Sequence, residues 1–193
     1  MDPRKVITVT LPGAPRTKKT SNRVVMLGKG DNRHPVVLPS EAFEGWLKTL
    51  LTFRAMIQRQ IRDTGVQIPV EYPVQIFARV FRDRDAGDFT GYAQAIGDAI
   101  QDSSWHCEGC NKNVLDSRLP QHREVCKVAK LSARRKGLGL ILDDAQIDNW
   151  DGTRLLIDRD NPRVELEIWP AEEAVTQAAL NFAVPDPFAE VGI

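Results

Sequence analysis

The sequence contains no long apolar run, no internal repeat and no low-complexity segment. Its longest apolar stretches, such as residues 138–142, are far too short to cross a bilayer. No apolar signal segment follows the first five residues, which lead directly into a strand-like pattern. We therefore expect a soluble, cytoplasmic protein that has no membrane partner.

Cysteine is scarce, and its distribution is uneven. The three cysteines all lie within residues 107–126, and an odd number in a chain without a secretion signal argues against a disulfide scaffold. With one histidine they form the pattern C-x2-C-x11-H-x3-C, made by Cys107, Cys110, His122 and Cys126. Zinc in structural sites prefers four tetrahedral sulfur or nitrogen ligands, and an H-x3-C pair places two of them on one helix face. The pattern predicts structural zinc, with His106 as the runner-up ligand and with Leu119 and Val125 as a small apolar core.

No charge sign dominates, since 26 basic and 26 acidic side chains give a net charge of zero. The basic residues are nevertheless concentrated: residues 1–40 hold eight of them against two acids, and residues 107–136 hold eight against three. Such blocks favour a polyanionic partner, and ordinary solvated surfaces are the alternative. The candidate contacts to a phosphate backbone are Arg16, Lys18, Lys19, Arg23, Arg82, Arg134, Arg135 and Lys136.

Hydrophobic residues make up 42% and charged residues 27% of the 193, a balance that excludes wholesale disorder and collagen-like chains. Alternating or apolar segments predict strands at 5–11, 23–27, 73–81, 138–142, 153–157 and 163–169. Helical spacing predicts one long helix at about 41–64, capped by Ser40, a second beginning after Asp88, and a short one at 171–182.

Two groups of carboxylates follow predicted strands. Asp83, Asp85 and Asp88 come after the strand at 73–81, and Asp143 and Asp144 come after the segment 138–142. Carboxylates at neighbouring strand ends can converge on one Mg²⁺ ion, which prefers hard oxygen ligands and serves phosphodiester hydrolysis. Helix caps and turns are the alternative, because Asp is common in both. Asp98 lies about 15 Å from Asp88 along the same helix, so the two cannot share an ion.

The segments 88–100 (DFTGYAQAIGDAI) and 142–147 (LDDAQI) resemble the RusA family of Holliday junction resolvases. Its usual pattern is D-x-D-N-x-x-K-x-x-x-D-A-L followed by D-D-x-Q-[IV]. The opening strand that ends in LPGAP at 11–15 and the NPRV sequence at 161–164 are also similar to that family. The resemblance covers roughly residues 5–104 and 138–169, so residues 105–137 form an inserted zinc-binding module and residues 171–193 an acidic C-terminal tail.

The resemblance implies an α+β fold with a small mixed sheet and two main helices. It also implies a homodimer that binds four-way DNA junctions and cuts them with Mg²⁺ or Mn²⁺, in recombination and repair. Asp88 and Asp144 match the catalytic, metal-binding aspartates, and Asp143, Asp85 and Thr90 are further candidate ligands. We therefore expect a metal-dependent, structure-selective DNA endonuclease. The zinc module would help bind DNA, or alternatively would recruit a protein.

Three positions depart from the family pattern. Thr90, Gly91 and Gln94 stand where the family usually has Asp, Asn and Lys. One acidic ligand and one phosphate-contacting lysine are therefore missing, since a threonine hydroxyl is a weaker ligand than a carboxylate. These departures motivate the second hypothesis, in which the protein binds branched DNA without cleaving it.

Overall fold

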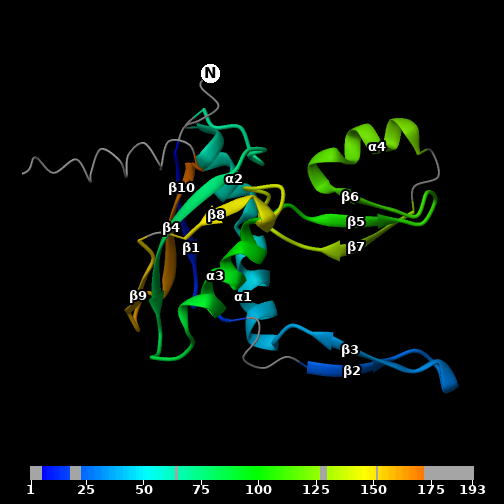
Figure 1. Cartoon of the computed structure of the whole chain (residues 1–193), viewed down its shortest axis with the longest axis horizontal. Coiled ribbons are helices and arrows are strands. Elements are labelled where there is room, and N and C mark those ends of the chain that lie inside the picture. The colour runs from blue at the N-terminus through cyan, green and yellow to red at the C-terminus, as the bar shows by residue number, and fades with distance from the viewer. Residues whose placement is uncertain (1–5, 18–22, 64, 127–129, 151, 172–193) are drawn as a thin grey trace, which may run out of the picture.

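The computed structural model describes residues 6–17, 23–63, 65–126, 130–150 and 152–171, which fold into a mixed α+β architecture, as predicted (Figure 1). The helices are α1 (Glu41–Thr52), α2 (Arg54–Asp63), α3 (Phe89–Ile100) and α4 (Leu119–Val125). The strands are β1 (Ile7–Pro12), β2 (Arg23–Leu27), β3 (His34–Leu38), β4 (Val74–Arg82), β5 (Ser104–Cys107), β6 (Lys112–Leu115), β7 (Leu131–Arg135), β8 (Ile147–Asn149), β9 (Arg154–Ile157) and β10 (Arg163–Pro170). No helix in these ranges is long and apolar enough to span a membrane.

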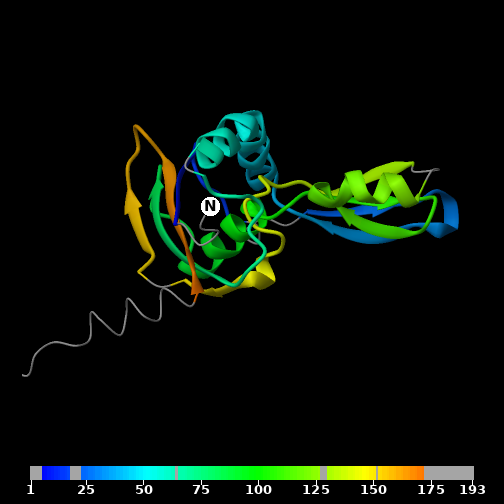
Figure 2. The ribbon, with the colours of Figure 1, turned by 90° about the horizontal axis from the view of Figure 1, so that it is seen from above.

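The main part of the molecule, which we call the body, is built around a five-stranded mixed sheet. β10 lies between β1 and β4 and is antiparallel to both, while β8 and β9 pair in parallel with the other edge of β4. Along β10, Val164, Leu166 and Ile168 are buried and alternate with the partly exposed Glu165 and Glu167. The helices α1, α2 and α3 lie on the face that these apolar side chains present (Figure 2). The alternation in the sequence therefore selects the face on which the core forms.

The long helix predicted at 41–64 is two helices. Ser40 caps α1 as expected, because its hydroxyl accepts a hydrogen bond from the Phe43 amide at 3.1 Å. At Phe53 the backbone N–H bonds to the carbonyl of Leu50, three residues back, and the chain turns before α2 begins. Both helices still bury their apolar stripes in one core, which is why their spacing matched a single helix.

The prediction of a strand at residues 138–142 is wrong. Gly139 has a φ of +73°, which is incompatible with a strand, and Ile141 forms only isolated bridges with Val70 and Gln101. Leu138, Leu140 and Ile141 are fully buried, so the apolar run belongs to the core without belonging to the sheet. The helix predicted at 171–182 and the acidic tail lie outside the described residues, apart from Ala171.

Two structures project from the same side of the body (Figures 1 and 2). One is the two-stranded β2–β3 hairpin, which we call the arm (residues 23–38); β3 was not predicted. The other is the zinc module, in which β5 lies between β6 and β7 in a separate antiparallel sheet beside α4. The module has no strand in common with the sheet of the body.

The module joins the body through two adjacent segments, 101–104 and 135–138, which we call the neck. The Ser103 hydroxyl donates to the Gly137 carbonyl at 3.2 Å and accepts from the Gly137 amide at 3.1 Å. A Cβ atom on Gly137 would lie 2.0 Å from the Gln101 carbonyl oxygen, so only glycine permits this approach. The two ends of the module are therefore held against each other.

Candidate functional site

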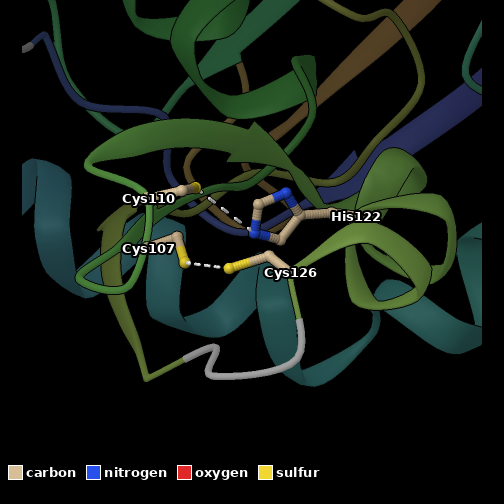
Figure 3. Close-up of side chains that lie close together, drawn as sticks. All are labelled: Cys107, Cys110, His122 and Cys126. Atoms are coloured by element: carbon tan, nitrogen blue, oxygen red, sulfur yellow. Dashed lines mark hydrogen bonds between the residues drawn. The ribbon is translucent and has the colours of Figure 1, made fainter.

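The four predicted zinc ligands converge in the module (Figure 3). Cys107 ends β5, Cys110 lies in the turn before β6, His122 belongs to α4, and Cys126 follows that helix directly. The Sγ atoms of Cys107 and Cys126 are 3.7 Å apart, and Sγ of Cys110 lies 3.8 Å from Nε2 of His122. All four ligand atoms lie within 4.8 Å of one another.

These separations fit a tetrahedral metal ion. With Zn–S bonds of about 2.3 Å, two sulfur ligands lie about 3.8 Å apart at the tetrahedral angle, whereas a disulfide would require about 2.05 Å. A hydrogen bond with His122 and one with the Cys110 backbone amide lower the pKa of Cys107 to about 6, which favours the thiolate that binds metal. The Cys107, Cys110, His122 and Cys126 cluster can therefore hold a structural metal such as zinc, with no ligand position left for catalysis.

The module has almost no apolar core of its own. Only Cys107 and Val114 are buried among its described hydrophobic residues. The expectation for Val125 is wrong, because that side chain is 87% exposed, and Leu119 is only partly buried. Three short strands and one short helix cannot exclude enough water to fold alone, and a metal held by the four ligands would supply the missing stabilisation.

A polar network fixes the module to the body at the neck. Asp102 is almost fully buried, and its two carboxylate oxygens accept hydrogen bonds from the amides of Ser103 (2.9 Å) and Ser117 (3.0 Å). Arg54 of α2 donates to Asp116 at 2.9 Å, and the Trp105 indole donates to the same carboxylate at 3.0 Å. Because these contacts join α2 to both β5 and the turn after β6, the module has one defined orientation.

The first acidic group is engaged in local contacts. Asp88 caps α3, where its Oδ1 accepts from the Gly91 amide at 2.6 Å. Asp83 forms a two-bond ion pair with Arg16, at 2.7 and 2.6 Å, which holds the pKa of Asp83 below its ordinary value. Asp85 pairs with Arg82 at 3.0 Å. Asp88 and Thr90 are both exposed at the start of α3.

The second acidic group is a pair of neighbouring carboxyl groups. Asp143 caps a short 3-10 turn (Asp144–Gln146), and the amide of Ala145 that it accepts from is the main cause that lowers its pKa. Burial raises the pKa of Asp144, and the hydrogen bond and negative charge of Asp143, with the charge of Asp98, raise it further.

The structure does not bring Asp88 and Asp144 together within the chain. A Cβ atom on Gly97 would lie 3.6 Å from Cβ of Asp144, so Asp144 lies beside the C-terminal end of α3. Asp88 lies nine residues earlier, about 13 Å along the helix axis. Among the described residues, the only group of three or more Cys, His, Asp or Glu side chains that converges at metal-binding distance is the zinc cluster. The expected convergence of the two acidic groups on one ion is wrong for a single chain.

Asp98 lies near Asp143 and Asp144, and the sequence did not reveal this. Its charge acts on Asp144, and its Oδ1 accepts from the Gln101 side chain at 3.1 Å. Thr90, Gln94 and Asp98 follow one another at four-residue spacing and are the more exposed positions of an otherwise buried helix, together with Phe89. This spacing is the signal that could have identified a polar stripe between the two acidic groups.

Most of the predicted phosphate contacts that the structure describes form ion pairs within the chain. Arg16 bonds to Asp83, Arg23 to Glu41 and Glu44, and Arg135 to Asp143 at 3.4 Å. Arg82 is 8% exposed and also donates to the carbonyls of Ala86 and Gly87. Lys136 is exposed. Lys18, Lys19 and the Arg134 side chain lie outside the described part of the structure.

A comparison of the chain with models of protein families finds no match, and a comparison with curated proteins finds none either. The resemblance to the RusA family therefore rests on the motif residues alone.

Proposed function

We propose that this protein is a homodimeric, metal-dependent endonuclease that cuts branched DNA such as four-way junctions. The observation that carries the proposal is the position of the two acidic groups at opposite ends of one polar stripe on α3. In a two-fold symmetric dimer, a residue pair i and j recurs as j and i across the axis. If two α3 helices pack antiparallel across an axis near Gln94, each Asp88 lies beside the partner subunit's Asp144.

Such a composite site has the chemistry that phosphodiester cleavage needs. Asp88 and Thr90 would contribute oxygen atoms from one subunit, and the partner subunit's Asp144 would contribute a carboxylate from the other. A bound Mg²⁺ or Mn²⁺ would lower the pKa of an attacking water and neutralise charge on the phosphate. Asp143 accepts hydrogen bonds from the Ala145 amide and the Arg135 guanidinium, which would hold it in place beside Asp144.

The test uses two variants that are inactive alone and active together. Asp88→Asn and Asp144→Asn should each abolish cleavage of a synthetic four-way junction in Mg²⁺ and leave junction binding largely intact. Mixed in equal amounts, they form heterodimers in which one composite site has both aspartates and the other has neither. About a quarter of the wild-type nicking rate should return, because half of the dimers are mixed and each has one intact site.

The outcome of the mixing experiment is decisive when the protein is dimeric. No recovery from a mixture that exchanges subunits would place any catalytic site within one chain and contradict the composite site. Cleavage that persists in both single variants would exclude these aspartates altogether. A double variant, Asp88→Asn with Asp144→Asn on one chain, mixed with wild type is the matched control.

A second candidate function is binding of branched DNA without cleavage. It is favoured by Thr90, Gly91 and Gln94, which leave the start of α3 without the second carboxylate and the lysine of the family pattern. Selective junction binding by the wild-type dimer, with no nicks in Mg²⁺ or Mn²⁺, would support this alternative. The zinc module lies on the side from which the arm projects, and in both cases it would contact a DNA branch bound there.

A further inference from the structure

We propose that the arm inserts its apolar face into the minor groove of a DNA branch and bends it there. The inference rests on the proposed binding of branched DNA and adds the contact and its mode. It concerns residues 23–38, among which only Arg23 was predicted from the sequence to contact DNA.

The arm presents a continuous apolar face to solvent. In the β2–β3 register, Val24 is opposite Val37 and Met26 is opposite Pro35, so these four side chains lie on one face. Val24 is 68%, Val37 62% and Met26 56% exposed, and Pro35 is exposed as well. Large apolar side chains gathered in this way on a soluble chain mark a surface that a partner covers.

The arm does not owe its position to packing against the body. It has only two strands, and such a hairpin is marginally stable in water without further contacts. At its base Arg23 bonds to Glu41 at 2.9 Å, to Glu44 at 2.7 Å and to the Pro39 carbonyl. These bonds fix the arm to the start of α1, and the hairpin and its loop project from the body (Figure 1).

The charges of the arm select nucleic acid as the partner. Neither strand contains an acidic residue, and the loop adds Lys29 and Arg33 against the single acid Asp31. Within the described residues Lys29 and Arg33 form no ion pair, in contrast to Arg16 and Arg163 of the body. An apolar face bordered by free cations is complementary to a groove whose edges are phosphates and whose walls are sugars.

The shape of the arm and the kind of its side chains select the minor groove. Five-residue strands are about 17 Å long, and β-ribbons of this size enter DNA grooves. The exposed face offers no hydrogen-bond donor or acceptor to read base edges in the major groove. Minor-groove proteins instead insert apolar side chains such as Met and Pro between base steps and kink the duplex. Met26 and Pro35, the pair nearest the loop on the apolar face, are the wedge.

The test measures affinity and DNA bending separately. The probes are a four-way junction and a duplex with a central mismatch, each carrying a fluorophore pair that reports the angle between its arms. Met26→Ser should lose the change in energy transfer on binding and weaken affinity about tenfold, while Met26→Leu should restore both, because an apolar wedge is what the kink requires. Lys29→Ala with Arg33→Ala should keep the bend at saturation and reduce the salt dependence by about two counterions.

Controls separate an apolar wedge from a dimer contact and from a general effect of removing a surface apolar side chain. Leu156→Ser removes a 36% exposed apolar side chain from β9, away from the arm, and should change neither quantity. Wild-type bending and affinity in Met26→Ser would overturn the proposal. So would a Met26→Ser protein that no longer dimerises in sedimentation experiments but bends DNA as before, since a second copy of the chain would then cover the apolar face. If the wild-type protein does not bind the junction, the proposed function is overturned as well. If the wild-type protein binds and cuts the junction and Met26→Ser has the same affinity and bending, only the apolar wedge is overturned.

Discussion

The body and the zinc module differ in what stabilises them. The body surrounds a cluster of fully buried Val, Leu, Ile and aromatic side chains, contributed by β1, β4, β10 and α1 to α3, and none of its members lies between residues 105 and 137. The module buries Cys107 and Val114 and relies on four convergent ligands. A segment of this length cannot bury enough apolar surface to offset its conformational entropy, and a metal bound by these ligands would take the place of the core. The two regions should therefore unfold independently.

Removing the metal should produce the largest effect, confined to the module. Structural zinc contributes on the order of 10 kcal/mol in small zinc-dependent folds. A chelator, or Cys107→Ser, should abolish the amide exchange protection of β5, β6 and β7 and leave that of β1, β4 and β10 unchanged, as hydrogen exchange would show. Ser132→Ala, in β7 but outside the ligand set, is the matched control. Simultaneous loss of protection in the body would contradict the independence of the two regions.

A cavity in the sheet should have the converse effect. Leu166 is fully buried at the centre of β10, so Leu166→Ala should lower the free energy of unfolding of the body by about 2–5 kcal/mol. Zinc affinity, measured by competition with a chelator, should not change. Leu156→Ala, at a partly exposed position of β9, should cost less than about 1 kcal/mol and calibrates the measurement. A fall in zinc affinity with Leu166→Ala would mean that the regions are coupled.

The neck joins the two regions, so a change there tests whether they depend on each other. In Asp102→Asn one oxygen acceptor becomes an amide donor, so the amide of Ser103 or Ser117 loses its partner at a cost of about 1–3 kcal/mol. We expect both regions to remain folded while the module reorients, which residual dipolar couplings would detect. Glu71→Gln removes the exposed partner of Arg118 and should have almost no effect. An unchanged module orientation in Asp102→Asn would show that the network is dispensable.

The smallest expected effect is the acid response of the body at the Arg16–Asp83 pair. Arg16 lowers the folded-state pKa of Asp83, so the pair stabilises the protein above the unfolded pKa of Asp and loses that contribution as the pH falls through the folded pKa. Both side chains are partly solvated, so the pair contributes about 1 kcal/mol. Urea unfolding should show Asp83→Asn to be less stable than wild type at pH 7 and equal to it near pH 2. A constant difference across that range would assign the loss to packing.

The parts of this molecule that the sequence predicted are those with strict local periodicity. The alternation of Val164, Leu166 and Ile168 predicts β10 and its buried face, and the C-x2-C-x11-H-x3-C spacing predicts the metal cluster, because both depend on neighbours along one element. The segment 138–142 has the composition of a strand, but Gly139 gives it a left-handed turn beside Gln101, and composition cannot reveal that geometry. β3 escaped prediction because Pro35 interrupts an otherwise strand-like run.

The acidic residues show why the candidate site was harder to predict than the fold. The sequence places Asp88 at the start of α3 and Asp144 after the module, but it does not say at which end of α3 the chain returns. The return is fixed by long-range bonds, such as the Leu138 amide to the Ala99 carbonyl and the Gln146 side chain to the Val70 and Tyr72 carbonyls. These bonds place Asp144 near Asp98 and away from Asp88, an arrangement that only tertiary structure determines.

The neck has a consequence for how such a chain can be altered. The chain leaves the body at Ser103 and returns at Gly137, and these two residues are hydrogen-bonded to each other, so the path of the body is closed before the module begins. A two-residue Asn-Gly turn could join the two points without moving either. The module is therefore a cassette: it can be excised, exchanged for another small fold or acquired in a single step, while the sheet and the polar stripe of α3 keep their places.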